Sequence, residues 1–321
     1  MEELYLDCNQ KEEFNRYWLL CPIIQSGNTI LQKLTKEWRS LYLNSSIGTG
    51  MSKIAKLGVI GDPIEHSLSP FIHSRFARLT NINIEYLPYK VNQDEFKSFV
   101  NDFFKDPTSK GLNITLPHKK LATKIDGIIS KEASYINAVN TLVKDDKKIF
   151  LYSTDGEGFF DDVKQKGFDL LNKRVLVIGA GAAVESILYR IANSDVKSIT
   201  IFNRTVETAE KLARKYSHMK EVDTFLSRDN KYDIVINGSS AGLTGEFKPT
   251  NDFLISNNAI FYDLNYSLAE TPFCKWASDK SNHVYDGIGM LVFQAAHSYK
   301  MWFGVFPETK TVLADLEAMR E

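Results

Sequence analysis

Cysteine is scarce in this sequence. The three cysteines, Cys8, Cys21 and Cys274, form no Cys-x-x-Cys pair among 321 residues. An odd number of widely spaced cysteines argues against a disulfide framework, and the absence of a close pair argues against a zinc site. We therefore expect the protein to work in a reducing, cytoplasmic setting.

An excess of charge of one sign is lacking as well. The chain has 39 Lys and Arg against 40 Asp and Glu, and we find no basic face dense enough for DNA or RNA. No run of about 18 apolar residues occurs, and the acidic start of the chain lacks the basic segment and apolar core of a secretory signal. These absences predict no nucleic-acid partner, no membrane span and no export by that route.

The histidines lack the spacing of a metal site. The sequence contains no His-x-x-x-His or His-Glu-x-x-His pattern, which would place two imidazoles on one helical face. We expect no metal, and we interpret the six histidines as capping, surface or core residues: His66, His73, His118, His218, His283 and His297.

The length of the chain predicts two domains. At 321 residues and 36.5 kDa, it exceeds the roughly 250–300 residues at which a single core stops growing. Residues 1–50 differ from the rest of the chain, because Asn28 can cap a helix with an apolar stripe and a turn-rich stretch then leads to Met51. This segment is either an extension ahead of a natural start at Met51 or an appended helical pair that packs on the body or on a partner subunit.

The strongest pattern in the sequence is at residues 173–181. Four apolar residues, 175–178, lead into Gly179-Ala-Gly181, as a buried parallel strand leads into a nucleotide-binding turn. Apolar residues then recur at helical spacing over residues 183–194. In this arrangement Gly179 permits a tight turn, Gly181 lets the backbone approach a pyrophosphate, and the N-terminus of the helix donates N–H groups to it.

Strand and helix patterns alternate on both sides of this turn. Before it we expect strands at 57–60, 84–91 and 111–116 and helices at 70–79 and 94–104, which form a βαβ series and a mostly parallel sheet. After it we expect strands at 198–202, 232–236 and 260–264 and a helix at 291–302 that returns to the first domain. Gly58-Val-Ile-Gly61 resembles a second cofactor turn, but Asp62-Pro63 follows where glycines and a helix start are needed, so we reject it.

Hydroxyl and amine groups follow the first and third predicted strands, at the sheet edge where α/β proteins bind ligands. Ser67 and Ser69 precede Pro70, a favoured first helical residue, so Ser69 is either a helix cap or a ligand for substrate. Asn113-Ile-Thr-Leu-Pro-His-Lys119 ends the third strand and brings Asn113, Thr115 and Lys119 to the same edge of the sheet. Lys119 is either an ordinary surface lysine or an acid/base group.

Two further polar residues lie farther along the chain. Asn140 precedes a hairpin-like pair of short strands, and Asp155 follows that pair in Thr154-Asp-Gly156. Asp155 is either a helix N-cap, the commonest use of such an aspartate, or a carboxylate that pairs with Lys119. In such a pair each group would hold the other in its charged form until substrate arrives.

Several motifs together resemble the shikimate dehydrogenase family. They extend from about residue 55 to the C-terminus in the family's order, whereas the first 50 residues take no part: His66–Pro70, Asn113–Lys119, Ala138–Thr141, Thr154–Gly156, the turn at Gly179, Asn203–Thr205, Asp286–Met290 and Gln294–His297. The resemblance implies an NADP-dependent oxidoreductase that reversibly reduces the 3-keto group of 3-dehydroshikimate to shikimate, in aromatic amino acid biosynthesis.

The resemblance also implies the fold and the domain boundaries. The fold would be α/β, with an N-terminal, mostly parallel α/β substrate domain and a Rossmann-type dinucleotide-binding domain. The substrate domain would be discontinuous and comprise residues 51–155 plus 291–321. The NADP-binding domain would comprise residues 156–290, and residues 1–50 would be an N-terminal extension.

Individual residues receive roles from the same resemblance. Lys119 and Asp155 would form the catalytic pair, and Ser67 and Ser69 would hold the substrate carboxylate. The ring hydroxyls would be bound by Thr115, Asn140 and Gln294, with Tyr266 reaching the substrate from the cofactor domain. The expected cofactor-binding residues are Gly179, Ala180, Gly181, Ala182, Ala183, Asn203, Arg204, Thr205, Gly287 and Met290.

Cofactor choice depends on the residues after the predicted strand 198–202. Arg204 stands about two dozen residues past Gly179, where an NAD enzyme typically carries Asp or Glu. Arg204 is therefore either a ligand for the 2′-phosphate of NADP or a solvent-facing loop residue. Glu185 and Thr208 stand where the family commonly has cations, and Val184 where it has a small residue. We predict NADP as the cofactor, with weakened NADP affinity or mixed NAD and NADP use as an alternative hypothesis.

Two competing functions stay open. One is an NAD-tolerant quinate/shikimate dehydrogenase paralogue, and the other is a non-catalytic NADP-sensing protein on the same scaffold. The retained Lys119, Asp155, Ser67 and Ser69 argue against the sensor. As partners we expect a small-molecule substrate and, in the assembly, a monomer or homodimer.

Overall fold

The computed structural model describes residues 54–227, 229–239, 246–249 and 252–320. The predicted N-terminal extension, its helix capped by Asn28, Cys8 and Cys21 lie outside the described residues. Residues 228, 240–245, 250, 251 and 321 also lie outside them.

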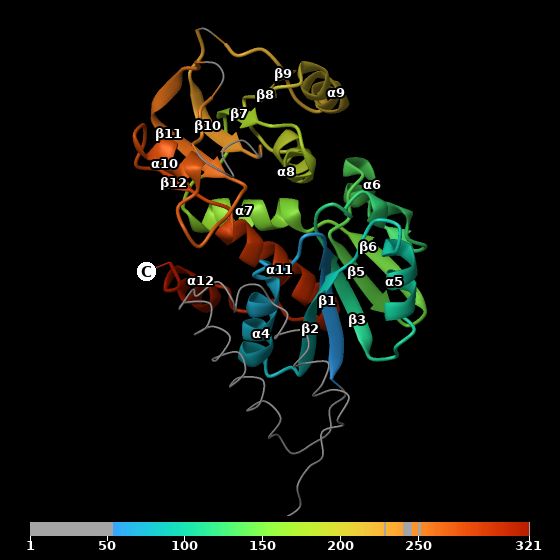
Figure 1. The fold of residues 1–321 in the computed structure, drawn as a ribbon. Coiled ribbons are helices and arrows are strands. Elements are labelled where there is room, and N and C mark those ends of the chain that lie inside the picture. Colours follow the sequence, from blue (N-terminus) through green and yellow to red (C-terminus); the bar gives the residue numbers. More distant parts are fainter. Residues whose placement is uncertain (1–53, 228, 240–245, 250–251, 321) are drawn as a thin grey trace, which may run out of the picture. The chain divides into compact units, whose positions relative to one another are not determined.

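The first sheet has the strand order β2-β1-β3-β5-β6-β4 (Figure 1). β1 pairs in parallel with both β2 and β3, while β5 runs antiparallel to β3 and β6. The expectation of a mostly parallel sheet is confirmed for the βαβ part, and the hairpin of β5 and β6 adds the antiparallel pairs. The strands are β1 Ala55–Gly61, β2 Ile84–Lys90, β3 Ser109–Ile114, β4 Ile128–Ile129, β5 Thr141–Asp145 and β6 Lys148–Tyr152.

Helices α4 (Ser69–Thr80) and α5 (Phe96–Phe103) connect the parallel strands of this sheet. Leu68 is the N-cap of α4, no side chain caps the helix, and Pro70 lies in its first turn. The interpretation of Ser69 as a helix cap is therefore wrong. The Ile72 N–H donates to the Leu68 carbonyl (3.0 Å), so the helix begins one residue earlier than predicted and Ser69 is its first residue.

The second sheet has the order β12-β11-β10-β7-β8-β9, and its pairs are parallel. This order, with the first strand central and the series continuing outward on each side, is that of a dinucleotide-binding fold. The strands are β7 Arg174–Ile178, β8 Ser198–Phe202, β9 Val222–Asp223, β10 Tyr232–Asn237, β11 Ile255–Asp263 and β12 Val284–Tyr285. Three helices accompany them: α8 Ala182–Ala192, α9 Val206–Tyr216 and α10 Pro272–Ser278.

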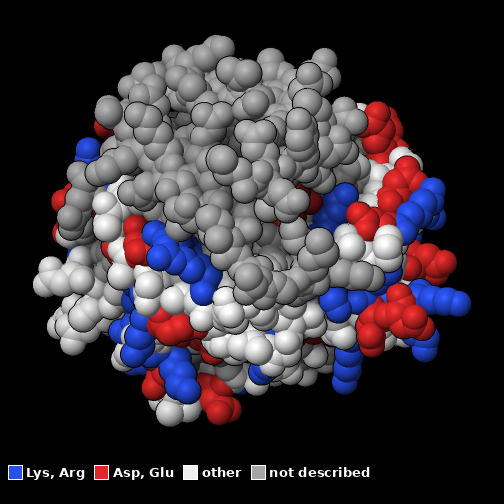
Figure 2. Space-filling model, turned by 90° about the horizontal axis from the view of Figure 1, so that it is seen from below, with Lys and Arg blue, Asp and Glu red and all other residues white. Residues whose placement is uncertain are grey.

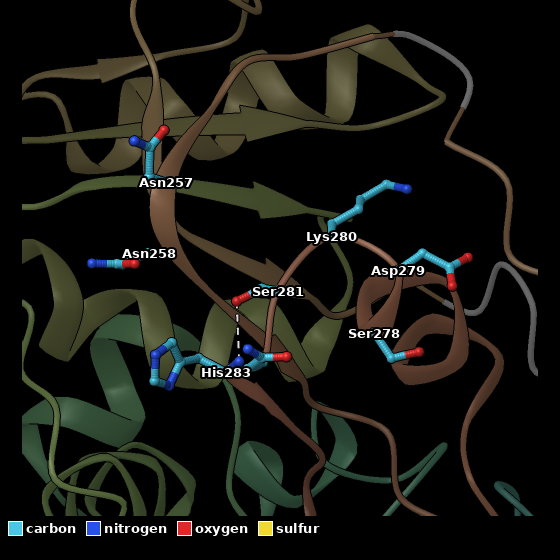
Figure 3. Close-up of a pocket in the computed structure, with 8 residues that line it drawn as sticks. Asn257, Asn258, Ser278, Asp279, Lys280, Ser281 and His283 are labelled. Carbon is cyan, nitrogen blue, oxygen red and sulfur yellow. Dashed lines mark hydrogen bonds between the residues drawn. The ribbon is translucent and has the colours of Figure 1, made fainter.

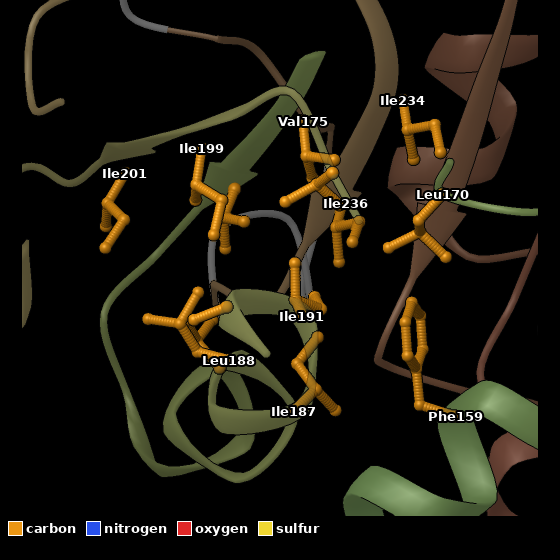
Figure 4. Packing of buried hydrophobic residues seen from close by; sticks show 14 of the residues in the cluster. Phe159, Leu170, Val175, Ile187, Leu188, Ile191, Ile199, Ile201, Ile234 and Ile236 are labelled. Atoms are coloured by element: carbon orange, nitrogen blue, oxygen red, sulfur yellow. The ribbon is translucent and has the colours of Figure 1, made fainter. Parts of the chain in front are cut away.

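The core of the second sheet confirms the helical periodicity predicted for residues 183–194. Ile187, Leu188 and Ile191 of α8 are fully buried against Val175 of β7 and Ile199 of β8, together with Ile234 and Ile236 of β10 (Figure 4). Burying one such aliphatic side chain contributes about 1.5–3 kcal/mol. This packing fixes the position of the α8 N-terminus beside the turn at Gly179.

Two long helices run between the sheets. These are α7 (Asp155–Gln165) and α11 (Ile288–Phe303), and α11 also packs on α4 and on α12 (Lys310–Glu317) (Figure 1). A Cβ added at Gly158 of α7 would lie 2.6 Å from the backbone nitrogen of Gln294 on α11. The glycine therefore allows a backbone approach that any other residue would prevent.

The predicted elements match the structure in type and differ at their ends. The predicted strand 198–202 coincides with β8, whereas the helix predicted at 291–302 begins at Ile288 and the one at 94–104 begins at Phe96. No helix in the described part of the chain is long and apolar enough to cross a membrane. On the face drawn in Figure 2, basic and acidic side chains of the described residues are interspersed.

Candidate active site

The candidate site begins where the strand order of the first sheet reverses. β1 lies between β2 and β3, so the loops that follow β1 and β3 leave the sheet side by side at its carboxyl edge. Ser67 and Ser69 follow β1, and Thr115 and Lys119 follow β3. The backbone N–H of Thr115 donates to the carbonyl of Ile60 (2.9 Å), which ties the two loops together.

Lys119 and Asp155 form an ion pair at the centre of this edge. Nζ of Lys119 lies 2.7 Å from Oδ2 of Asp155, and the two side chains are 16% and 7% exposed. Asp155 is the first residue of α7 and Thr154 is its N-cap, so the interpretation of Asp155 as the cap is wrong. The positive end of the α7 dipole favours a carboxylate in this first turn, and that leaves the side chain free to pair with lysine.

Asn140 orients the carboxylate of Asp155. Its Nδ2 donates to Asp155 Oδ1 (2.8 Å) and to Gln294 Oε1 (3.3 Å). Its Oδ1 accepts from the backbone N–H of Thr154 (2.9 Å). Because the Thr154 N–H can only donate, this contact fixes which end of the Asn140 amide carries the oxygen. Asp155 therefore has one oxygen held by an amide and the other by an ammonium group.

A deeper group of polar side chains supports Asn140. Asn113 Nδ2 donates to the Asn140 carbonyl (3.2 Å) and to Ser298 Oγ (3.0 Å), and Thr141 Oγ1 donates to Asn140 Oδ1 (2.9 Å). These side chains are buried, and Tyr86 Oη donates to Asn113 Oδ1 (2.8 Å). Sequence patterns did not indicate Tyr86 or Ser298 as part of the site, and they included Thr141 and Thr154 in motifs without giving either residue a role. Ser298 stands four residues after Gln294, so helical spacing could have indicated it.

His73 of α4 lies behind this group. Its ring is fully buried and stacks on Tyr86, with centroids 4.2 Å apart and an interplanar angle of 14°. Neither ring nitrogen has a hydrogen-bond partner among the described residues. Burial disfavours the charged imidazolium, which lowers the pKa of His73 to about 3, and burial raises the pKa of Tyr86 well above its ordinary value. Both rings are therefore neutral near pH 7.

The structure brings some of the predicted substrate residues together and leaves others apart. Lys119, Asp155, Asn140 and Gln294 form one connected hydrogen-bonded group. Ser67 and Ser69 are linked to each other, because the Ser69 N–H donates to Ser67 Oγ (3.3 Å). Tyr266 is 37% exposed after β11, and it contacts none of these groups through a hydrogen bond or ring contact within the described residues.

The turn between β7 and α8 has the geometry of a phosphate site. Gly179 has φ +106°, and a Cβ there would lie 2.9 Å from the backbone of Gly238, so only glycine suits the position. Gly181 is the N-cap of α8, no side chain caps the helix, and a Cβ there would meet nothing within 4 Å. Open space over uncapped N–H groups of Ala182 and Ala183 fits an anionic group such as a pyrophosphate.

The loop after β8 presents a cation near the same edge. Nδ2 of Asn203 donates to the Thr205 carbonyl (2.9 Å) and closes the loop, and Arg204 between them is exposed. Arg204 makes no ion pair with any residue that the structure describes. Its guanidinium is therefore available to a ligand, which fits the 2′-phosphate of NADP.

Glu185 does not face this cation. Its carboxylate lies 2.7 Å from Lys215 Nζ of α9 and 3.9 Å from Lys120 Nζ, and the side chain is 15% exposed. Two lysines thus offset the negative charge in the first turn of α8. The unfavourable effect on an anionic ligand that the sequence suggests is reduced accordingly.

Gly287 and Met290 begin α11. Gly287 is the N-cap, its N–H donates to the Asn265 carbonyl (3.0 Å), and a Cβ there would lie 2.5 Å from the Leu264 carbonyl oxygen. Met290 is 8% exposed and packs in the core of the second sheet. The start of α11 can therefore offer its backbone to a ligand, but not the Met290 side chain.

A separate polar hollow lies away from these residues. It has a volume of about 290 Å³ and is lined by Asn257 and Asn258 of β11 and by residues 278–283 (Figure 3). These residues precede or begin β11 and β12, at the opposite edge from the Gly179 turn. This hollow is therefore not part of the candidate site. Among the described residues there is also no cluster of three or more His, Cys, Asp or Glu that could hold a metal ion.

Comparisons with known proteins agree on one family. Residues 59–142 match the model described as "Shikimate dehydrogenase substrate binding domain", and residues 162–244 match "Shikimate / quinate 5-dehydrogenase". The chain is 40% identical over 262 residues to shikimate dehydrogenase (NADP(+)) of Hahella chejuensis, an alignment that covers 80% of this chain and 97% of that protein.

Solved structures give the same result. Shikimate 5-dehydrogenase of Listeria monocytogenes, in complex with shikimate and NAD, has a TM-score of 0.76 and 26% identity and covers 84% of this chain and 99% of its own. The Thermus thermophilus enzyme, in complex with NADP(H) and shikimate, has a TM-score of 0.73 and 25% identity and covers 83% and 98%. Both comparisons thus extend over nearly the whole length of the relative.

Proposed function

This chain belongs to the shikimate dehydrogenase family, and we propose that it catalyses the reversible, NADPH-dependent reduction of 3-dehydroshikimate to shikimate. The observation that supports this most directly is the enclosed Lys119–Asp155 ion pair, 2.7 Å long and joined through Asn140 to Gln294. We propose that it is the catalytic centre.

Lys119 serves the carbonyl that is reduced. Negative charge develops on the carbonyl oxygen as the carbon accepts a hydride, and a proton must reach that oxygen. The Lys119 ammonium supplies both the positive charge and the proton. Asp155 keeps the ammonium in place and accepts a hydrogen bond from a neighbouring substrate hydroxyl.

The remaining substrate residues hold the ring in position. The hydroxyls of Ser67 and Ser69 donate to the substrate carboxylate, since a carboxylate needs donors. Thr115, Asn140 and Gln294 bind ring hydroxyls, and Tyr266 contacts the ring from the side of the second sheet. Holding the substrate at several points places its carbonyl next to Lys119 and reduces the entropic part of the barrier.

NADPH, when bound, supplies the hydride. Its pyrophosphate would lie against the turn formed by Gly179, Ala180, Gly181, Ala182 and Ala183 and would accept from N–H groups at the α8 start, whereas the Gly179 N–H is occupied by the Phe202 carbonyl. Arg204, with Asn203 and Thr205, would bind the 2′-phosphate, and Gly287 and Met290 at the α11 start would contribute to the site of the nicotinamide. The uncapped α8 N-terminus and the exposed Arg204 support this assignment.

The experiment follows absorbance at 340 nm with purified protein, shikimate or quinate, and NADP⁺ or NAD⁺ in parallel. Rapid reduction of NADP⁺ with shikimate, and much slower reaction in the other three mixtures, is the expected result. Comparable rates with quinate or NAD⁺ would assign the protein to the quinate/shikimate class instead. No reaction in any mixture would contradict an enzymatic function and favour the NADP-sensing alternative.

The setting and assembly of the protein are part of the same proposal. We propose that it acts in the cytoplasm, as a monomer or homodimer, with residues 51–155 plus 291–321 as the substrate domain and 156–290 as the NADP domain. The packing of α4 and α11 on the first sheet, and of α12 on α4 and α11, supports the discontinuous substrate domain. Size-exclusion chromatography with light scattering measures the assembly.

A further inference from the structure

A second buried carboxylate lies where α7, α11 and the second sheet meet. Asp162 stands on α7 two turns after Asp155, and it is fully buried. Tyr262 Oη donates to its Oδ2 (2.7 Å), while its Oδ1 is buried with no hydrogen-bond partner in the described part of the chain. An unpaired carboxylate oxygen in the interior lowers stability, so Asp162 is not explained by stability alone.

Asp162 lies directly against the first turn of α11. A Cβ added at Gly289, the second residue of that helix, would be 1.9 Å from Asp162 Oδ1. The first turn of a helix is its positive end, so it favours a negative charge at this place. An asparagine here would turn an NH₂ group toward the N–H groups of the same turn, which is unfavourable.

Tyr262 joins Asp162 to the second sheet. Tyr262 is fully buried on β11, and its ring meets Phe159 of α7 edge-on, with centroids 5.1 Å apart. Asp162 and Tyr262 therefore connect α7, α11 and β11 through one hydrogen bond and two close contacts. We refer to these two residues as the Asp162–Tyr262 brace.

The brace acts on the two helices that carry the candidate site. α7 begins with Asp155, and α11 carries Gln294, which accepts a hydrogen bond from Asn140. Between brace and site the helices touch, since a Cβ at Gly158 would lie 2.6 Å from the Gln294 nitrogen and 2.7 Å from the Met290 oxygen. A displacement of the α11 start is therefore passed on to Gln294 and Asp155, because packed helices move as rigid bodies.

We propose that Asp162 and Tyr262 are positioning residues, in which ionised Asp162 holds the start of α11 against α7 and so sets Asp155 and Gln294 for reaction. The proposal rests on the proposed function. Neither residue touches the substrate, and both act through the two helices.

The charges around Asp162 define its pH dependence. Burial raises the pKa of Asp162 to about 6 with a smaller contribution from the nearby Asp286, whereas the Tyr262 hydroxyl and Lys166, the C-cap of α7, lower this pKa. Asp286, just before α11, is itself paired with Arg320. These are the charged and titratable groups that face Asp162 from α7, β11 and the start of α11. The carboxylate is therefore ionised at pH 8 and becomes protonated as the pH falls through about 6.

The test compares Asp162→Asn and Tyr262→Phe with matched controls. Tyr216→Phe makes the same change at a buried tyrosine whose hydroxyl has no partner among the described residues, and Asp233→Asn removes a carboxylate that bonds Ser256 and the Arg174 N–H. The measurements are kcat and KM for shikimate with NADP⁺ over pH 5–9, Tm at pH 8, and Kd for NADPH from its fluorescence.

We expect kcat to fall at least about tenfold at pH 8 in both brace variants, because small displacements of reacting groups are costly. The Kd for NADPH should change much less than kcat, because the α8 turn and Arg204, which are proposed to hold the pyrophosphate and the 2′-phosphate, are not altered. Asp162→Asn should also keep or raise Tm at pH 8, and it should lose the decline in kcat near pH 6 that we expect for wild type. A merely structural residue would lower Tm and leave the pH profile unchanged.

Several results would overturn the proposal. One is wild-type kcat and wild-type pH profile in both brace variants, and another is a loss of kcat matched in the control variants. A loss of kcat that only follows the fraction of unfolded protein would also refute it, and Tyr262→Phe provides this test if Asp162→Asn does not fold. Wild-type protein inactive with shikimate and NADP⁺ would contradict the proposed function as well, whereas active wild type with unaffected variants contradicts this role alone.

Discussion

Lys119 and Asp155 depend on each other for position as well as for charge. Lys119 follows β3 and Asp155 begins α7, so the two side chains come from elements 36 residues apart that are fastened separately. The Val139 N–H donates to the Lys119 carbonyl (2.9 Å) and fixes the backbone of the lysine. Asn140 fixes the carboxylate. The ammonium is thus held before substrate binds, which is the condition for effective electrostatic stabilisation.

Replacing Lys119 by methionine should lower kcat by about 10²–10⁴-fold, the range for loss of a general acid. Methionine is an unbranched side chain only one atom shorter, and it removes the charge and the proton. The neighbouring Lys120 is 61% exposed and only 3.9 Å from Glu185, so Lys120→Met is the matched control and should keep most of the activity. Steady-state kinetics with shikimate and NADP⁺ measure both, and equal rates in the two variants would refute the assignment of Lys119.

Arg204→Ala should raise the KM for NADP⁺ about 10–100-fold and leave the KM for NAD⁺ nearly unchanged. A hydrogen bond to a charged group contributes about 1.5–3 kcal/mol, and only NADP has the 2′-phosphate that would form one here. Arg214 on α9 is exposed and pairs with Glu210 within the same helix, so Arg214→Ala is the control. An equal effect of Arg204→Ala on both cofactors would indicate a solvent-facing loop residue instead.

At the scale of helices and strands, glycines decide how closely the two linking helices approach. Gly158 of α7 faces the Gln294 nitrogen and the Met290 oxygen of α11, and Gly289 of α11 faces Asp162 of α7. Glycine within a helix costs about 1 kcal/mol relative to alanine. The close contact of α7 and α11, which sets Asp155 beside Asn140 and Gln294, offsets that cost.

Gly158→Ala and Gly181→Ala should separate stability from cofactor binding. The first variant forces a Cβ against α11, and overpacking of this kind costs about 1–3 kcal/mol of unfolding free energy. The second adds a Cβ where nothing lies within 4 Å, so its Tm should not fall, whereas its Kd for NADPH should rise. Urea unfolding and NADPH fluorescence distinguish the two. A stable Gly158→Ala protein would contradict the close contact of the helices.

The alternation of strands and helices could be predicted because the apolar residues carry it. Val175–Ile178 is buried as one continuous run, and residues 183–194 repeat at helical spacing. The helix ends were harder to predict, since a local pattern does not fix the exact first residue of α4 at Ser69, and tertiary contacts override the local pattern at Asp155. Asp155 begins α7 without capping it, because its carboxylate is occupied by Lys119 and Asn140.

The supporting residues of the site could not be predicted in the same way. Asn113 Nδ2 reaches Ser298 across 185 residues of sequence and Asn140 reaches Gln294 across 154, and no local pattern reports such a contact. The ion pairs of Glu185 with Lys120 and Lys215 could not be predicted for the same reason. A glutamate in the first turn of α8 is unfavourable for an anionic ligand when considered alone, but Lys215 of α9 lies 2.7 Å away.

At the scale of the whole molecule, the two sheets are also connected beside the linking helices. Arg190 of α8 donates to both carboxylate oxygens of Glu132 in α6 (Lys131–Ile136), at 2.9 and 2.7 Å. Tyr135 of α6 donates to the Lys215 carbonyl of α9 (2.7 Å). Bidentate, half-buried pairs of this kind hold their geometry better than exposed ones. Helix α6 beside the first sheet is thus joined to α8 and α9 beside the second, in addition to the contact of α7 with α11.

Two buried groups give this molecule opposing dependences of stability on pH. The pKa of His73 is lowered from 6.5 to about 3, so the unfolded chain binds its proton first and the unfolding free energy falls as the pH drops below 6.5. The pKa of Asp162 is raised from 3.8 to about 6, so the folded protein binds that proton first and the unfolding free energy rises from pH 6 toward 4. Between pH 6 and 4 the two contributions largely cancel.

Variants at these two positions should therefore show a pH dependence of the unfolding free energy that largely cancels in wild type. His73→Phe keeps an aromatic ring against Tyr86 and removes the titrating group. As the pH falls from 7 to 4.5, its unfolding free energy should therefore rise by about 3 kcal/mol relative to that of wild type. The unfolding free energy of Asp162→Asn should fall by about 2 kcal/mol relative to that of wild type over the same range. Urea unfolding at several pH values measures both differences. Curves that run parallel to wild type would mean that neither group is neutralised by burial, whereas opposite slopes would show that the buried imidazole behind the site and the carboxylate between the helices balance each other.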